Sequence, residues 1–89
     1  MSKIEKILML LLSGRSDTNF DFSELVNLLD RLGFTLRIKG SHHIFYRDDI
    51  EEIIYLQPDK NKAKAYQVKQ VRNLILKYNL KIDSDEQPI

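Results

Sequence analysis

The segment Lys39-Gly40-Ser41-His42-His43-Ile44-Phe45 decides how this chain folds. It contains both histidines of the protein and lies between two stretches in which apolar and polar side chains alternate. Gly40-Ser41 predicts a two-residue β-hairpin loop, with glycine at the first central position, where a positive φ is needed. Counting outward from this loop predicts four cross-strand pairs: Lys39 with His42, Ile38 with His43, Arg37 with Ile44, and Leu36 with Phe45.

The alternation of side chains along a strand sorts the hairpin into two faces. We expect one face to cover the core, and it holds Leu36, Ile38, His43 and Phe45. We expect the other face to stay open, and it holds Arg37, Lys39, His42, Ile44 and Tyr46. The sequence therefore places an imidazole, which titrates near neutrality, beside two cations on an open surface.

The segments before the hairpin predict two helices. Ser2 and Glu5 form a capping-box pattern, so a first helix is expected to begin at Lys3 and to stop at Gly14. Apolar side chains surround much of this helix, which predicts burial against the domain, with a partner-binding surface as the alternative. Asp21 and Glu24 form a capping pair that opens a second helix, which ends before Gly33. The core face of this helix consists of Phe22, Leu25, Val26, Leu29 and Leu32.

The segments after the hairpin predict a strand and a helix. A turn at Asp48-Asp49 leads to a strand from Glu52 to Gln57, with Ile54 and Leu56 on its core side. Pro58 ends this strand, and a polar, lysine-rich loop follows. Helical spacing then marks the segment from Tyr66 to Tyr78, whose apolar arc contains Val68, Val71, Leu74, Ile75 and Tyr78.

This order of elements predicts an α+β fold, in which a three-stranded antiparallel sheet carries helices on one face. We expect residues 1–20 to form an N-terminal helical extension, residues 21–81 the domain itself, and residues 82–89 a flexible acidic tail. The second and last helices are expected to cover Leu36, Ile38 and Phe45, which leaves the opposite face of the sheet open.

Composition and charge narrow the class of protein. The 89 residues include no cysteine, which excludes a disulfide framework and thiolate metal sites. The longest apolar run, from Ile7 to Leu12, is too short to span a membrane, so we expect a cytoplasmic protein. Residues 31–81 carry eleven Lys and Arg against five Asp and Glu, a net charge of +6. This basic region is where a polyanionic partner is expected to bind, although an ordinary solvated surface is the alternative.

His42 is the candidate catalytic residue. Cleavage of a phosphodiester needs a group that exchanges protons near neutral pH and cations that hold the developing charge, and His42 with Arg37 and Lys39 offers both. A plain surface histidine is the alternative. A third metal ligand is not evident, so we expect neither a metal nor another cofactor. His43 is expected to be structural.

A second group of cations surrounds the start of the last helix. Lys60, Lys62 and Lys64 precede this helix, and Lys69 and Arg72 lie on its polar side. Unpaired amides at a helix N-terminus favour phosphate, so these residues are expected to contact the backbone of a nucleic acid. A solvated loop is the alternative.

Together these residues resemble HicA-type toxins, the small mRNA interferases of HicA–HicB toxin–antitoxin pairs. The resemblance covers roughly residues 22–80 and is carried by Leu32-Gly33-Phe34, by Arg37-Ile38-Lys39-Gly40-Ser41-His42 with the following Ile44-Phe45, by Pro58, and by the helix with Val68-Lys69-Gln70-Val71-Arg72-Asn73-Leu74-Ile75. It implies a fold like that of double-stranded-RNA-binding domains. It also implies that the histidine after Gly-Ser, His42, is catalytic, and the lysine cluster resembles the one that touches phosphates in those domains.

The resemblance implies the toxin of a type II toxin–antitoxin pair, which binds and cleaves mRNA by metal-independent histidine catalysis and pairs with a HicB-type antitoxin. The expected RNA-binding residues are Arg37, Lys39, Ser41, Lys60, Lys62, Lys64, Lys69 and Arg72. Two alternatives remain open at this point. One is a non-catalytic RNA-binding module of the same fold, and the other is a protein-interaction domain that docks through its apolar first helix. The sequence leaves the oligomeric state open.

Overall fold

The computed structural model describes residues 2–82 and contains the predicted helices and strands in the predicted order, together with a short 3₁₀ helix that the sequence did not predict. They are α1 (Lys3–Ser13), the short 3₁₀ helix η1 (Asp17–Asn19), α2 (Phe22–Arg31), β1 (Thr35–Lys39), β2 (His42–Arg47), β3 (Ile50–Leu56) and α3 (Ala65–Tyr78). The acidic tail expected over residues 82–89 lies, apart from Ile82, outside the described residues. Within residues 2–82, no helix is long and apolar enough to cross a membrane.

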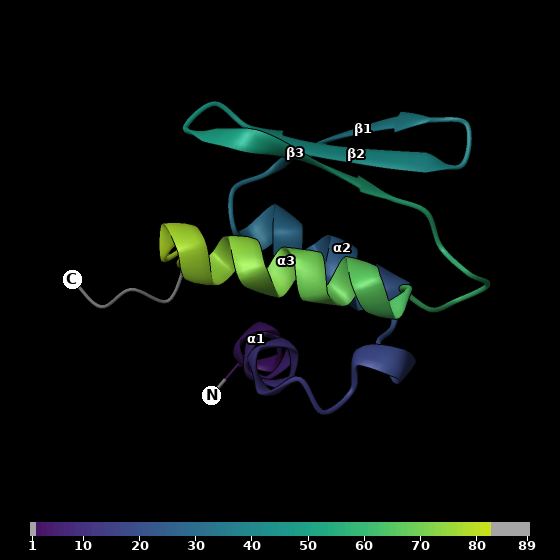
Figure 1. Ribbon diagram of the computed structural model, residues 1–89, viewed down its shortest axis with the longest axis vertical. Coiled ribbons are helices and arrows are strands. Elements are labelled where there is room, and N and C mark those ends of the chain that lie inside the picture. Colours follow the sequence, from purple (N-terminus) through teal and green to yellow (C-terminus); the bar gives the residue numbers. More distant parts are fainter. Residues whose placement is uncertain (1, 83–89) are drawn as a thin grey trace.

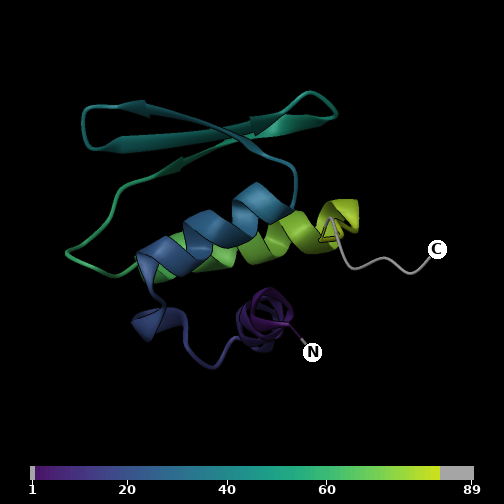
Figure 2. The same cartoon turned by 180° about the vertical axis from the view of Figure 1, so that it is seen from behind.

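The elements form three layers. Figures 1 and 2 show the sheet as one outer layer, α2 and α3 side by side beneath it, and α1 with η1 on the far side of these two helices. The sheet is antiparallel with strand order β1-β2-β3. This is the predicted α+β arrangement with an additional N-terminal helix, and it leaves one face of the sheet turned away from the helices.

The hairpin has the predicted register. Lys39 pairs with His42, and the remaining pairs follow outward to Leu36 with Phe45. Gly40 has a φ of +63°, as the first central position of a type II′ turn requires. A Cβ built at this glycine would meet no atom within 4 Å, so the backbone conformation alone is what favours glycine here.

The prediction that the helices cover Leu36 and Ile38 is wrong. These side chains are 39% and 59% exposed, whereas Phe45, Ile54 and Leu56 on the same side of the sheet are buried. The reason is the position of β1 at the edge of the sheet, where all five of its residues are exposed. The helices therefore bury side chains of β2 and β3, and β1 projects past the core.

The two N-terminal helices differ in how they begin. At α1 the predicted capping box is present, because the Ser2 hydroxyl accepts from the Glu5 N–H at 3.2 Å and the Glu5 carboxylate accepts from the Ser2 N–H at 2.8 Å. At α2 the predicted capping pair is wrong. Asp21 is the N-cap residue, but its side chain makes no capping bond and instead accepts from Nζ of Lys62 at 2.6 Å. The carboxylate thus connects α2 to a distant loop.

One hydrophobic core joins the layers. Leu28, which the sequence pattern did not single out, is fully buried in α2 together with Leu25 and Leu29. From α1, Ile7 and Leu11 enter the same cluster, so this helix packs on α2 and α3 as predicted. The core thereby fixes α2 and α3 under the sheet, and the outward-facing Ile44 and Tyr46 of the hairpin lie outside it.

Candidate functional site

The face of the sheet turned away from α2 and α3 presents the side chains that the hairpin register predicts there. Across the three strands, Arg37 lies opposite Ile44, and Ile44 lies opposite Tyr55. In the next row toward the turn, Lys39 lies opposite His42. Among residues 2–82, no helix or strand covers this face (Figures 1 and 2). We call it the open face.

The two histidines point in opposite directions. His42 is exposed on the open face. His43 faces the helices, where its ring meets the Phe22 ring edge-on with centroids 4.9 Å apart. The Nδ1 atom of His43 is buried and has no hydrogen-bond partner among residues 2–82. His42 is therefore accessible to a ligand in solution, whereas His43 packs against the helix layer.

The cations beside His42 are not engaged elsewhere. Arg37 and Lys39 are exposed, and neither forms an ion pair with any residue that the structure describes. Arg47 at the other end of β2 differs, since its guanidinium binds the Asp49 carboxylate at 2.9 and 2.7 Å and donates to the Leu32 carbonyl at 2.6 Å. The free cations of the hairpin thus lie at the His42 end of the open face.

Two glutamines tie the hairpin turn to α3. The Gln57 side chain donates to the Ser41 hydroxyl at 3.2 Å, and its backbone carbonyl accepts from the Gln67 side chain at 3.3 Å. Gln67 is buried, and its side-chain Oε1 accepts a hydrogen bond from the backbone N–H of Lys64 at 3.1 Å. Sequence reasoning missed both glutamines. The signal for Gln67 was its place four residues before Val71, which puts a polar side chain on the apolar arc of α3.

The lysine-rich loop before α3 is an ordered turn. Asp59 and Lys62 exchange backbone hydrogen bonds of 2.9 and 3.1 Å across it. The Phe22 N–H donates to the Asn61 carbonyl at 2.9 Å, and the Ala63 N–H donates to the Phe20 carbonyl at 2.8 Å. These bonds fix the loop to the segment that enters α2, so its lysines have defined positions.

The predicted phosphate-binding cations divide into free and paired groups. Within the described chain, Lys60, Lys64 and Lys69 form no ion pair. Lys62 is half-exposed and is paired with Asp21. The sequence placed Lys60, Lys62 and Lys64 in the loop before α3, where the structure has them, but could not show that Lys62 already has a carboxylate partner.

Arg72 is committed to the fold. Its guanidinium binds the Asp17 carboxylate through two bonds of 2.9 and 3.0 Å and also donates to the Leu11 carbonyl at 3.1 Å. Its side chain is only 17% exposed. The pKa of Asp17 is lowered, chiefly by the hydrogen bonds from Arg72. Arg72 therefore joins α3 to η1 and to the end of α1, instead of standing free on the polar side of α3 as the sequence suggested.

The hairpin turn and the lysine loop lie at the same end of the molecule (Figure 1). Between the inner side of the hairpin and this loop is a cleft of about 560 Å³, which His43 lines together with Phe22, Pro58 and Lys60. His42 lies on the other side of β2. Within residues 2–82, no group of three or more His, Cys, Asp or Glu side chains is arranged to hold a metal ion.

A protein-family comparison assigns the chain. The model of a family described as the HicA toxin of bacterial toxin-antitoxin matches residues 22–78. This chain belongs to the HicA toxin family. The matched region contains the hairpin, the lysine loop and α3, and hence His42 and every predicted RNA-binding residue. Comparison with curated proteins and with solved structures gives no match.

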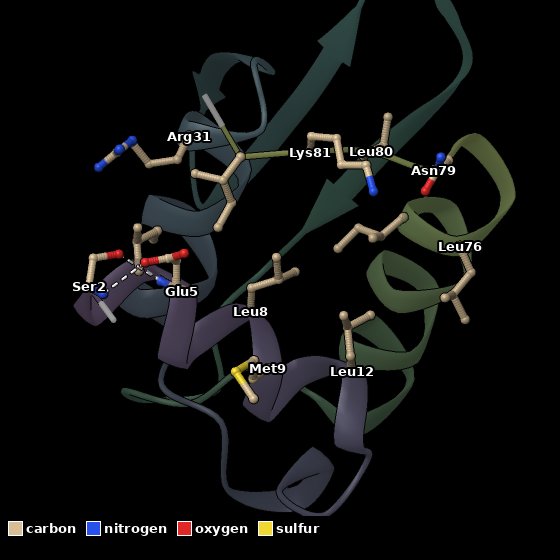
Figure 3. Close-up of a pocket in the computed structure, with 13 residues that line it drawn as sticks. Ser2, Glu5, Leu8, Met9, Leu12, Arg31, Leu76, Asn79, Leu80 and Lys81 are labelled. Carbon is tan, nitrogen blue, oxygen red and sulfur yellow. Dashed lines mark hydrogen bonds between the residues drawn. The ribbon is translucent and has the colours of Figure 1, made fainter. Parts of the chain in front are cut away.

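The helix α1 lies outside the part of the chain that matches the HicA family. It forms one wall of an apolar groove of about 440 Å³, and the end of α3 with the residues after it forms the other (Figure 3). Met9, Leu12 and Leu76 remain exposed along this groove. The family assigns the chain as a toxin whose counterpart is an antitoxin, and the groove is one apolar surface on which a protein could dock.

Proposed function

We propose that this HicA-family toxin is an endoribonuclease that cleaves mRNA by acid–base catalysis at His42, without a metal ion. The observation that carries the proposal is the open face, where His42 is exposed beside two cations that have no partner in the described chain. The phosphates of the RNA backbone are suitable partners for the positive charges of Arg37 and Lys39. The imidazole of His42 can transfer a proton near neutral pH.

The reaction needs two proton transfers. The ribose 2′-OH attacks the adjacent phosphorus and loses its proton, while the bond to the 5′ oxygen breaks and that oxygen gains a proton. His42 performs one of these transfers, as base toward the 2′-OH or as acid toward the leaving oxygen, which contributes about 10²–10⁴-fold to the rate. Arg37 and Lys39 stabilise the charge that develops on the phosphate.

RNA is held by a second group of contacts. Lys60 and Lys64 in the loop and Lys69 on α3 form no ion pair within the described chain, and the loop lies at the end of the molecule that contains the hairpin turn (Figure 1). Lys62 contributes less because its ammonium group already binds Asp21. We assign Arg72 to the fold. Ser41 completes the RNA-facing turn, and its bond to Gln57 orients that turn relative to α3.

The test uses the purified chain and an mRNA transcript labelled at its 5′ end. We expect fragments that end in a 2′,3′-cyclic phosphate, new 5′-OH ends, and an unchanged rate in excess chelator. A transcript of the same sequence with a 2′-deoxy residue at the main cleavage position should resist cleavage there and nowhere else. Binding without cleavage would favour the alternative of a non-catalytic RNA-binding module, and activity lost in chelator and restored by a divalent ion would contradict metal-independent catalysis.

A protein contact is favoured by a separate observation, the groove between α1 and α3 with its exposed Met9, Leu12 and Leu76. We propose that the cognate HicB-type antitoxin is the protein partner of this cytoplasmic toxin. Apolar contacts resist salt, whereas RNA contacts weaken with it. Antitoxin binding that survives high salt but fails in Leu12→Glu would support docking in the groove, and binding that Leu12→Glu leaves unchanged would place the antitoxin elsewhere.

A further inference from the structure

We propose that the open face is a stacking platform for the bases of single-stranded RNA, with Tyr55 as its central ring. The proposal rests on the function proposed above and names the form of RNA that this site takes. It concerns a side chain on β3 that contributes neither to the core nor to any hydrogen bond with a described residue.

Tyr55 is placed beside the proposed catalytic group. It lies opposite Ile44, which is two residues from His42 along β2, so Tyr55 and His42 are diagonal neighbours on one face. Diagonal neighbours in an antiparallel pair are about 7–8 Å apart, which is within reach of aromatic side chains. A base that stacks on Tyr55 would therefore bring its ribose and phosphate close to the imidazole.

Apolar and aromatic side chains are exposed around Tyr55 on the open face. Tyr55 is 57% exposed, Ile53 on the same strand face is 45% exposed, and Tyr46 on β2 is 36% exposed. Each of these side chains keeps at least about a third of its surface exposed on the open face. Every base has a π face, and aromatic side chains on a sheet are a known way to hold bases without reading their sequence.

Charge favours a polyanion over a protein as the occupant. Arg37 and Lys39 follow one edge of the platform along β1, and two residues along a strand span about 6.6 Å. The only carboxylate that β3 presents on this side is Glu51, at the end far from the hairpin turn. We infer that the phosphates follow β1 while the bases lie over β2 and β3.

The arrangement selects unpaired RNA. In a duplex the faces of the bases are already stacked on one another, so a tyrosine ring can reach them only where the strand is open. The phosphodiester that His42 attacks should therefore lie in an unpaired segment.

The test measures binding in a His42→Ala background, so that no RNA is cleaved. Fluorescence anisotropy compares Tyr55→Ile and Tyr55→Phe on a labelled 12-nucleotide RNA and on the corresponding RNA duplex. Isoleucine keeps the strand preference and the apolar surface but removes the ring, whereas phenylalanine keeps the ring. Tyr66→Ile, which removes an equally exposed ring from α3, is the matched control.

We expect Tyr55→Ile to weaken binding of the single strand about 5- to 150-fold, since stacking contributes roughly that much per base. Tyr55→Phe and Tyr66→Ile should stay within about twofold of the background, and the affinity for duplex should not change in any variant. Equal affinities for Tyr55→Ile and Tyr55→Phe, or an equal loss on duplex, would overturn the platform. A loss of antitoxin binding alone would assign the surface to a protein.

These outcomes are separate from those that test catalysis. A chain that never cleaves RNA but loses single-strand binding in Tyr55→Ile would contradict the proposed function and support the platform. A chain that cleaves RNA, but whose Tyr55→Ile variant binds single-stranded RNA as before, would support the proposed function and contradict the platform. Thermal unfolding of each variant confirms that the ring, and not the fold, has been removed.

Discussion

His42 and His43 are adjacent in the sequence, yet the structure gives them different surroundings. His42 is exposed on the open face beside free cations, and His43 packs edge-on against Phe22 under the sheet. The difference arises because successive side chains along a β-strand point to opposite faces of the sheet. The two-residue turn fixes the strand register and hence which histidine lies on which face. The chemistry proposed for His42 therefore depends on the strand register, because a shift by one residue would exchange the positions of the two imidazoles.

The basic residues show a similar division. Arg37 and Lys39 have no partner in the part of the chain that is described, whereas Arg47 and Arg72 bind carboxylates and backbone carbonyls. A basic residue in the sequence is therefore not always a free cation that can bind an RNA phosphate. Four variants that separate free from paired groups sharpen this comparison.

Replacing Arg37 and Lys39 together by alanine should slow cleavage at saturating RNA by about 100-fold, because the developing phosphate charge loses its donors. Single-turnover rates measure this effect. The matched control is Lys3→Ala with Lys6→Ala, which removes two cations from α1, on the side of the helix layer away from the sheet, and should leave the rate unchanged. Equal rates for both double variants would mean that the open face does not hold the reacting phosphate.

Arg72→Ala should lower the free energy of unfolding by about 1–3 kcal/mol, since it leaves the largely buried Asp17 carboxylate without its partner. Denaturant unfolding measures this loss. The salt dependence of RNA binding should stay as in the unmodified chain. A flatter salt dependence would show that Arg72 meets phosphate after all.

In contrast to Arg72→Ala, the double variant Lys60→Ala with Lys64→Ala should weaken RNA binding and leave the free energy of unfolding nearly unchanged. The slope of log affinity against log salt should flatten by roughly 1–2 units, at about 0.7 per phosphate contact to a single strand. Affinity should fall similarly for different RNA sequences, because phosphate contacts position the RNA without specifying its sequence. An unchanged slope would make the loop a solvated surface and move the RNA path elsewhere.

Glu52→Gln should have the smallest effect. Hydrogen bonds from Lys77 and Tyr78 lower the pKa of Glu52 to about 2, so the folded state favours the ionised carboxylate. This contribution is present above the ordinary pKa of the group and is lost as pH falls toward 2. The variant should melt less than about 5 °C below the unmodified chain at pH 7, and the gap should close near pH 2. A gap that is constant with pH would exclude the carboxylate charge as its cause.

The parts of the structure that follow from local rules could be predicted from the sequence. Gly40-Ser41 was sufficient to give the turn, the register and the opposite orientation of the two histidines. Individual contacts between residues far apart in the sequence could not be predicted. The exposure of Leu36 and Ile38 depends on β1 being the edge strand, and the bond from Arg72 to Asp17 joins residues 55 positions apart.

The candidate site was predicted in the same uneven way. Its central residue, His42, came from a local motif. Gln57, which tethers Ser41, and Gln67, which tethers Gln57, were missed because hydrogen bonds between separate elements leave no periodic pattern. Tyr55 was missed because an exposed tyrosine becomes informative only when its neighbours across the sheet are known.

The most direct test of the account is a pair of single-turnover cleavage rates at saturating RNA, for His42→Ala and for His43→Ala, each corrected for the folded fraction from thermal unfolding. The account predicts that His42→Ala folds normally and loses at least about 100-fold in rate, whereas His43→Ala melts earlier and keeps most of its rate. Equal rates in the two folded variants, or a greater loss in His43→Ala, would contradict it.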